Sequence, residues 1–275
     1  MILYRTYVPP PPLDAFIDNL WYWEGSDPGY AKDAILASNG VALLINLRYD
    51  ELSSFTGDGY ADENTLRGIG FSGTHARPFA IKAHQPHMMG MQFKPGGTWP
   101  FLKPGGDALH DRHLSLEDVW PRGEAERLHQ RLVQAPAPDD KFAILLGAFI
   151  ARAPRDFALD PAVSTALACF ARAPHRASVA GAAKRAEVSH KTLIRLFRET
   201  VGMTPKLFLR VTRFQRVIAD LHARRTIGWG DVVEQHGYYD QSHFIRDFRE
   251  FSGFSPTGWL KHRSVAMVSH VPLPD

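Results

Sequence analysis

Residues 189–205 are SHKTLIRLFRETVGMTP, and residues 240–256 are DQSHFIRDFREFSGFSP. The two stretches align at an offset of 51 residues, with Ile-Arg, Phe-Arg-Glu, Gly and Pro at matching positions. Similarity over this length at a fixed offset indicates two copies of one structural unit. The architecture of the C-terminal part of the chain follows from this repeat.

Each copy has the sequence pattern of a capped amphipathic helix. Ser189 and Asp240 are residues whose side-chain oxygens accept hydrogen bonds from the first free backbone N–H groups of a helix. Gly202 and Gly253 suit the left-handed residue that ends a helix, and the prolines that follow suit the first turn of the next one. Apolar residues repeat on one face and basic or polar residues on the other.

A shorter helix is predicted before each copy, over residues 179–188 and 229–239, and each meets its copy through a tight turn. Helix, tight turn and second helix form a helix-turn-helix unit. Residues 204–225 are predicted to form one connecting helix, about 33 Å long at 1.5 Å per residue. This length is close to the roughly 34 Å between successive major-groove faces on one side of B-DNA.

The region from about 160 to 263 resembles the DNA-binding domain of the AraC family of bacterial transcription regulators. The resemblance rests on the double motif, the connecting helix and the string GYYDQSHFIRDFREFSGFSPTGWL at 237–260. It implies that the helices beginning at Ser189 and Asp240 enter successive major grooves. The residues it places at the bases are Lys191, Ile194, Arg195, Gln241, Ser242, His243 and Arg246.

The chemistry of these side chains suits DNA. Arg195 and Arg246 can each donate two hydrogen bonds to guanine, and Gln241 can pair with adenine in the same manner. Ile194 and Ile245 are expected either to touch thymine methyl groups or to pack against a neighbouring helix. Phosphate contacts, which position without specifying sequence, are predicted for the remaining basic residues of the units, Lys184, Arg185, Arg198 and Arg249. In the first turn, Glu187 stands where the family commonly has glycine.

Composition and charge support a soluble two-domain protein with one basic part. The 275 residues carry a net charge of +3, but residues 175–275 hold 16 Lys and Arg against 9 Asp and Glu. A basic domain joined to an acidic one suggests a polyanionic partner for the basic part, although an Arg-rich solvated surface is an equally good interpretation of charge alone. No secretory signal or membrane span is recognised, and the single cysteine, Cys169, is expected to be a small core residue. We therefore expect a cytoplasmic location and no membrane partner.

The N-terminal part is predicted to be β-rich, with short apolar strands at 41–47, 68–73, 79–83 and 88–94 that favour an antiparallel sandwich or small barrel. Helices are predicted at 114–120, 124–134 and 141–153. The fold class is thus α+β and multidomain. A β-rich N-terminal domain with helices is followed by an all-α double helix-turn-helix domain. The expected boundaries are a first domain at 1–153, a linker at 154–160, the DNA-binding domain at 161–263 and a tail at 264–275.

The segments 19–23, 41–47 and 90–102 resemble a cupin-like domain found in front of AraC-type DNA-binding regions. This resemblance implies ligand sensing or dimerisation. Aromatic residues could line a small-molecule pocket or simply form the core; the candidate pocket residues are Trp21, Trp23, Phe93 and Trp99. The pair His84 and His87 has a ligand-like spacing, but no second motif completes a metal site, so no metal, no cofactor and no catalytic residue is predicted.

The sequence therefore predicts a non-enzymatic, sequence-specific transcription regulator. Its expected partners are double-stranded promoter DNA, a small-molecule effector, RNA polymerase and, as one option, a second copy in a homodimer. Two alternatives stay open at this point: a cupin-like metal-dependent enzyme with an accessory DNA-binding domain, and a protein whose basic helices bind another protein.

Overall fold

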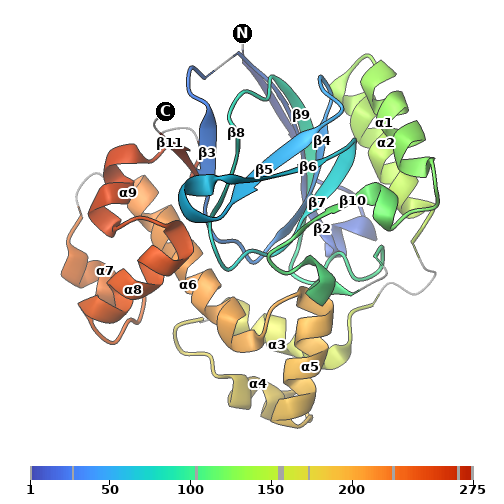
Figure 1. The fold of residues 1–275 in the computed structure, drawn as a ribbon. Coiled ribbons are helices and arrows are strands. Elements are labelled where there is room, and N and C mark those ends of the chain that lie inside the picture. Colours follow the sequence, from blue (N-terminus) through green and yellow to red (C-terminus); the bar gives the residue numbers. More distant parts are fainter. Residues whose placement is uncertain are drawn as a thin grey trace.

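The computed structural model describes residues 2–26, 28–102, 105–153, 158–172, 174–224, 227–264 and 267–273. Strands dominate its N-terminal part and helices its C-terminal part, which confirms the predicted α+β class (Figure 1). Helices α1 (Glu124–Gln134) and α2 (Pro138–Ile150) cover one side of the strands, while the remaining helices lie on the other side of the strands and below them in the view of Figure 1. Among the described residues, no helix combines the length and apolarity needed to cross a membrane.

The described strands form two antiparallel sheets. The first has the order β1-β2-β9-β4-β7-β10, with bounds Leu3–Tyr7, Ile17–Glu24, His87–Phe93, Val41–Asn46, Ile69–Ser72 and His113–Ser115. The second has the order β11-β3-β8-β5-β6, with bounds His270–Leu273, Lys32–Ile35, Phe79–Lys82, Leu52–Thr56 and Asp62–Leu66. The four strands predicted from the sequence correspond to β4, β7, β8 and β9.

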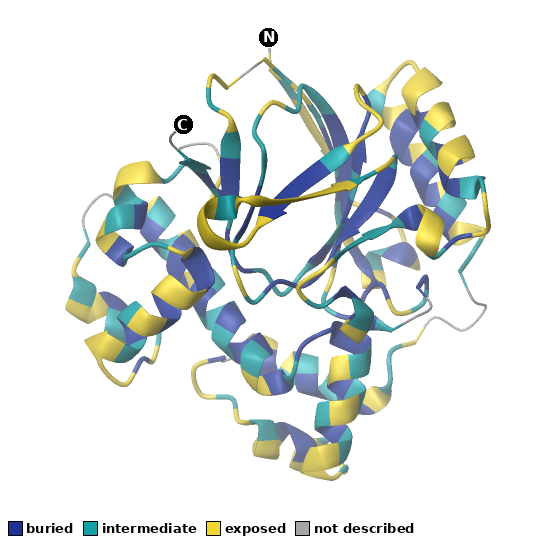
Figure 2. Ribbon diagram, viewed as in Figure 1, coloured by how far each residue is buried: buried dark blue, intermediate teal, exposed yellow. Residues whose placement is uncertain are grey.

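Strand alternation decides which side chains form the N-terminal core. Successive residues of a strand point to opposite faces of the sheet. On β2, Leu20 and Tyr22 are buried and join the cluster that packs against α1 (Glu124–Gln134) and α2 (Pro138–Ile150), whereas Trp21 and Trp23 point to the other face. The main apolar core of this domain therefore lies between the first sheet and the two helices (Figure 2).

The sequence prediction for residues 114–120 was wrong. A helix was expected there, but the chain forms the short strand β10 followed by one turn of 3₁₀ helix at Leu116–Asp118. Leu114 pairs with Phe71 of β7, so a place at the edge of the sheet overrides the helical pattern of this segment. The two neighbouring predictions hold, since α1 occupies the expected range and α2 begins three residues early, at Pro138.

Seven helices form the C-terminal part of the described chain. Their bounds, from α3 to α9, are Pro161–Arg172, Val179–Arg185, His190–Val201, Pro205–Ala223, Trp229–Gln235, Gln241–Ser252 and Pro256–His262. Helices α4 and α5 form the first helix-turn-helix unit, and α7 and α8 form the second. The buried faces of these helices meet in one apolar cluster that also includes Ala34 and Val271 from the second sheet.

Helix α6 joins the two units but is shorter than expected. It has 19 residues and ends at Ala223, so its axis is about 28 Å long rather than about 33 Å. Thr204 caps its first turn, and Pro205 occupies the first helical position as predicted. Its stripe of Phe208, Val211 and Phe214 is buried, so α6 is the central packing element of the helical part.

Part of the predicted tail at 264–275 forms a strand of the second sheet. Residues 270–273 form β11, the edge strand that pairs antiparallel with β3 of the second sheet. Pro272 fits this position because an edge strand can tolerate a residue without a backbone N–H group. After the helices, the polypeptide therefore returns to the second sheet, whose first strand in the sequence is β3. Of the predicted linker at 154–160, residues 154–157 lie outside the described residues.

Candidate nucleic-acid interface and interior cavity

Helix α5 is the first candidate recognition helix. The Ser189 hydroxyl accepts a hydrogen bond from the backbone N–H of Thr192 at 3.0 Å, which fixes the start of the helix. Leu193 and Phe197 are buried, so the opposite face is left to solvent. The predicted DNA-contacting residues Lys191, Arg195 and Arg198 are exposed on that face, and Ile194 is half-buried beside them.

Helix α8 repeats this arrangement. The Asp240 carboxylate accepts from the backbone N–H of His243 at 2.7 Å, and Phe244 and Phe248 are buried beneath the helix. Four of its five predicted DNA-contacting residues are exposed: Gln241, Ser242, Arg246 and Arg249. The fifth, His243, is half-buried, with its ring edge-on to Tyr238 and its Nε2 3.7 Å from Asp247.

The two principal arginines differ in their surroundings. Arg195 forms an ion pair with Glu199 one turn along α5, at 2.8 Å, yet 60% of its side chain is exposed. Exposed pairs of this kind contribute little to stability, so a phosphate or guanine can compete for the guanidinium. Arg246 has no ion-pair partner among the described residues. The geometry thus leaves a donor side chain available on each helix.

The two turns also share a backbone feature. Glu187 and Gly237 both adopt positive φ, at 56° and 66°. A left-handed residue makes the sharp reversal between the two helices of each unit, and glycine adopts it without steric strain. Glu187 has a side chain and therefore adopts this conformation with steric strain. It stands at the position where the resemblance to the AraC family would place glycine.

Arg210 of α6 fastens α8 to the connecting helix. Its guanidinium donates to Asp247 at 2.7 Å and to Glu250 at 2.6 Å. Burial alone would lower the pKa of Arg210, but the hydrogen bonds and charges of Glu250 and Asp247 outweigh it and raise that pKa. Asp247 is only 2% exposed and depends on this partner. The sequence analysis missed this brace, because 37 residues separate Arg210 from Asp247.

Both recognition helices touch the N-terminal domain at their C-terminal ends. The carbonyl of Phe251 accepts from the backbone N–H of Ala37 at 2.9 Å. At the end of α5, Gly202 adopts φ +91°, and a Cβ there would lie 2.7 Å from the carbonyl oxygen of Gly106. The exposed residues Lys191, Arg195, Gln241, Ser242 and Arg246 lie in the N-terminal halves of α5 and α8, whereas these contacts involve the C-terminal ends of the helices.

A cavity of about 1010 Å³ lies between the two sheets. Its walls come from the inward faces of both sheets, from α6 through Phe214, Gln215 and Ile218, and from residues 267–270. Because the core of this domain lies on the far side of the first sheet, the space between the sheets is not filled by side chains. One wall of the cavity is thus a helix of the DNA-binding region.

Two of the four predicted pocket residues line this cavity and two do not. Trp21 and Trp23 face it from β2. Phe93 is buried on the opposite face of β9, stacked among Phe71, Phe101 and Phe149, because it alternates in phase with Met89 and Met91. Trp99 is 42% exposed in the turn that follows β9. For Phe93 and Trp99 the expectation is therefore corrected.

One buried and one half-buried histidine, His75 and His113, line the cavity near β7 and β10. The rings of His75 and His113 are 4.8 Å apart, and both contact the ring of Phe79. Burial, with the charges of His113 and His110, lowers the pKa of His75 to about 3. Burial lowers the pKa of His113 to about 4. Both imidazoles are therefore neutral near pH 7.

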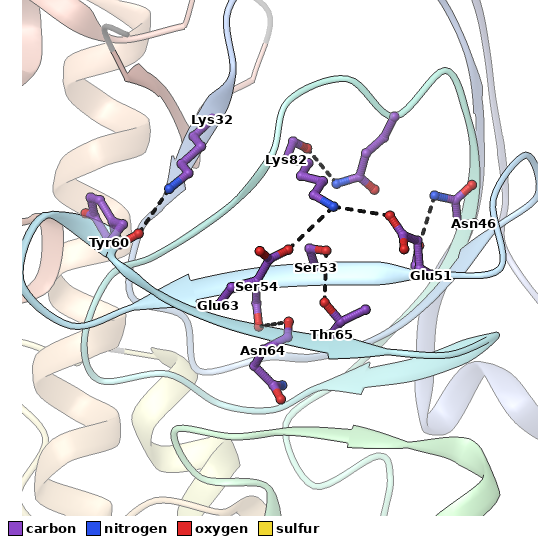
Figure 3. A network of polar contacts seen from close by, with 11 residues as sticks. Lys32, Asn46, Glu51, Ser53, Ser54, Tyr60, Glu63, Asn64, Thr65 and Lys82 are labelled. Carbon is purple, nitrogen blue, oxygen red and sulfur yellow. Dashed lines mark hydrogen bonds and ion pairs between the residues drawn. The ribbon is translucent and has the colours of Figure 1, made fainter.

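The cavity rim carries a polar network along the β5–β6 hairpin (Figure 3). Lys82 lies 3.1 Å from Glu51 and 3.5 Å from Glu63, while Lys32 donates to the backbone carbonyl of Tyr60 at 3.0 Å. The positive and negative charges of this network thus neutralise one another at the protein surface.

The histidine pair at 84 and 87 serves no shared site. His87 Nε2 lies 2.8 Å from the hydroxyl of Tyr22, whereas His84 is exposed. Within the described ranges, no three His, Cys, Asp or Glu side chains are grouped so that they could hold a metal ion.

Two family models match separate parts of the chain. Residues 182–262 match the family model described as a helix-turn-helix domain, and residues 5–115 match a domain of unknown function, DUF6597. A protein of Streptomyces lividans described as an AraC-like transcription regulator is 33% identical over 104 residues. That match covers 38% of this chain and 34% of the relative, so the chain spans about a third of the relative's length.

Several solved structures are also similar to this chain. ToxT from Vibrio cholerae shares 9% identity at a TM-score of 0.49, over 94% of this chain and 98% of that one. Wild-type ToxT with a bound unsaturated fatty acid gives 11% identity and a TM-score of 0.46, over 94% of both chains. The C-terminal domain of AraT, a response regulator from Geobacillus stearothermophilus, shares 20% identity at a TM-score of 0.35, over 38% of this chain and 88% of that one.

The fold and the family match define a protein with two parts. The C-terminal part is a helix-turn-helix domain, which is a DNA-binding class of domain. That domain matches a helix-turn-helix family model and contains the two units that the internal repeat predicted, and the relative it matches is described as AraC-like, in agreement with the resemblance stated above. It follows a β-rich domain that matches DUF6597. The cupin-like character of the β-rich domain stays a prediction.

Proposed function

We propose that this chain is a transcription regulator that binds a two-part DNA site through α5 and α8 and responds to a small molecule held between its sheets. The observation that carries the proposal is the repeated recognition helix. Each copy is capped in the same way, buries the same apolar face and exposes the N-terminal half that enters the major groove in helix-turn-helix proteins.

In this proposal the side chains have distinct roles. Arg195 and Arg246 each donate two hydrogen bonds to guanine, and Gln241 pairs with adenine. Ser242 and Lys191 reach base edges, while Arg198 and Arg249 hold phosphates and set the register. His243 contributes mainly by orienting the helix, since its ring packs on Tyr238 and faces Asp247.

The position of the cavity supports a role in regulation. A ligand in the cavity would touch Phe214 and Ile218 of α6, the helix that carries both units. Ala37, which follows β3 and lines the cavity, also donates to the carbonyl of Phe251 in the recognition helix α8. Ligand binding therefore acts on the relative placement of α5 and α8. A cytoplasmic location, contact with RNA polymerase and a homodimer stay predictions of the same proposal.

Selection of DNA from a random-sequence pool tests the DNA-binding part. The full chain is expected to enrich a site with two elements about one helical turn apart. Arg195→Ala with Arg246→Ala should remove the guanine preference in both elements while weaker, salt-dependent binding remains. Lys206→Ala, an exposed change on α6, is the matched control and should leave the site unchanged. Full sequence preference in the double variant would contradict the assignment of these two arginines.

A further inference from the structure

Asp33 is a buried carboxylate that faces the cavity from β3. The residue is 8% exposed, and its Oδ1 has no hydrogen-bond partner among the residues that the structure describes. Its Oδ2 accepts from the Tyr30 hydroxyl at 3.4 Å and lies 3.7 Å from Nδ1 of His270, a buried atom that also has no hydrogen-bond partner. An unpaired buried carboxylate oxygen is costly unless a donor reaches it, so this atom is a candidate ligand contact.

The other charged groups in the described cavity wall do not offer an equivalent contact. Lys82 already has two carboxylate partners, Glu51 and Glu63. His75 and His113 are neutral, because burial lowers both of their pKa values far below neutrality. Among these groups, the Asp33 carboxylate is the one that offers an acceptor without a hydrogen-bond partner to a ligand inside the cavity, and the ring of His270, which lies 3.7 Å from its other oxygen, is the titratable group next to it.

Aromatic side chains line the same cavity. Trp21 and Trp23 face it from β2 of the first sheet, which ends at Glu24, and Asp33 faces it from β3 of the second sheet, which begins at Lys32. Trp21 is next along β2, and its indole covers Gly90, where a Cβ would lie 2.5 Å from the ring. Indole faces attract cations and pack against apolar groups.

We propose that the cavity binds an organic cation: a protonated amine on an aromatic or aliphatic body, with the amine at Asp33 and the body against Trp21 and Trp23. This inference rests on the proposed sensing role and names its ligand class. The ammonium would supply the missing donor to Oδ1, and charge-assisted bonds of this kind are about twice as strong as neutral ones. The cavity, at about 1010 Å³, has room for a drug-sized molecule.

Calorimetry on the full chain with three matched probes tests the ligand class. The probes are 4-phenylbutylamine, 4-phenylbutan-1-ol and 4-phenylbutyrate, which share one body and differ in the charge of the end group. The amine is expected to bind about tenfold or more tightly than the alcohol, and the carboxylate most weakly. Asp33→Asn should abolish the preference for the amine without lowering the melting temperature, because it removes an unpaired buried charge.

Two controls separate this result from other causes. Asp58→Asn removes an exposed carboxylate in the β5–β6 turn and should leave all three affinities unchanged. Ala42→Phe fills part of the cavity and should weaken all three probes together. Equal binding of the probes, a preference for the carboxylate, an unchanged preference in Asp33→Asn, or no binding of any probe at millimolar concentration would overturn the proposal.

The DNA-selection experiment stands apart from this test, since it needs no ligand. If DNA selection succeeds and the amine shows no preference, the ligand class is wrong and the regulator stands. If the amine binds through Asp33 and no DNA site is selected, the ligand class stands and the proposed function fails.

Discussion

At the scale of single residues, Arg210 decides how α8 is held. It neutralises Asp247, which is 2% exposed, and its guanidinium also stacks 4.8 Å from the ring centroid of Phe251. Arg210→Ala should lower the free energy of unfolding by about 3 kcal/mol, because it leaves a buried carboxylate without its counter-ion. Urea denaturation followed by circular dichroism measures this change.

Lys206→Ala serves as the comparison for Arg210→Ala, since Lys206 is exposed on the same helix. It should change the free energy of unfolding by less than about 0.5 kcal/mol. Adding Asp247→Asn to Arg210→Ala should restore part of the loss. A double variant no more stable than Arg210→Ala would show that the buried charge is not the cause.

The lowered pKa values of His75 and His113 predict that the stability of the fold depends on pH. The pKa values of His75 and His113 are lowered to about 3 and about 4 in the folded protein, so the unfolded chain binds more protons below its ordinary histidine pKa. The contribution of these two groups to the free energy of unfolding should therefore be fully present above about pH 6.5. As the pH is lowered toward 4, the free energy of unfolding should fall by about 1.4 kcal/mol per pH unit for each histidine that remains neutral in the folded protein. Urea midpoints at pH 7 and pH 5 give the slope.

His113→Phe isolates one of the two groups. Phenylalanine suits the site, since the His113 ring contacts Phe79 and its Nε2 has no hydrogen-bond partner. In this variant the free energy of unfolding should depend less steeply on pH, because one of the two titrating histidines has been removed. His190→Gln, a change at an exposed position of α5, should leave the pH dependence as it is in the unchanged protein. The same slope in all three proteins would refute the assignment to His113.

Residues differ in how far their roles could be predicted from the sequence. The capping roles of Ser189 and Asp240 follow from residue type and helical spacing, and the structure has both caps. Asp33 could not be singled out, because its neighbour His270 lies at the other end of the chain and pairs with it only through the β3–β11 contact. Local patterns describe local contacts, and long-range partners need the fold.

At the scale of elements, the two recognition helices end on glycines that play unequal parts. Gly202 and Gly253 both adopt positive φ, but a Cβ at Gly202 would meet the Gly106 carbonyl at 2.7 Å, whereas a Cβ at Gly253 would meet Pro78 at 3.4 Å. Gly202→Ala should therefore cost more stability than Gly253→Ala, about 3 kcal/mol against about 1 kcal/mol. Thermal unfolding of both variants gives the comparison.

Equal losses in the two glycine variants would mean that backbone strain alone sets the cost and that the contact between α5 and Gly106 is loose. A larger loss at Gly202 would show that the end of α5 is seated tightly on the N-terminal domain. Selected DNA sites should be the same for both variants, since neither glycine lies on an exposed recognition face.

Elements with strong periodicity were predicted well. Helices α5, α6 and α8 lie where the repeat and its connecting stripe placed them, and α6 differs mainly at its C-terminal end. The failure at 114–120 arose because a short amphipathic segment fits either a helix or an edge strand, and pairing with β7 decides between them. The strand β11 was missed because Pro272 argues against a strand unless that strand lies at an edge.

At the scale of the whole molecule, β11 ties the helical part to the second sheet. Val271 is fully buried and belongs to the apolar cluster that the helices share with β3. Val271→Ser should lower the free energy of unfolding by about 2 kcal/mol and speed hydrogen exchange in β3, because it leaves a void and a buried hydroxyl at the junction. Hydrogen–deuterium exchange resolved by segment measures both strands.

Leu273→Ser is the control for Val271→Ser, since Leu273 is only partly buried on the same strand. It should have a smaller effect on stability and on exchange in β3. Unchanged protection of β3 in Val271→Ser would mean that β11 is not needed to hold that sheet.

The return of the chain to the second sheet also has a consequence for synthesis. The second sheet includes β11, so during translation it lacks its edge strand until the last of the helices have left the ribosome. Until then β3 presents an open edge and the cavity lacks the wall from residues 267–270. A nascent chain can thus complete the wall of this cavity only after the C-terminal helices exist, so the N-terminal part matures last although it is made first.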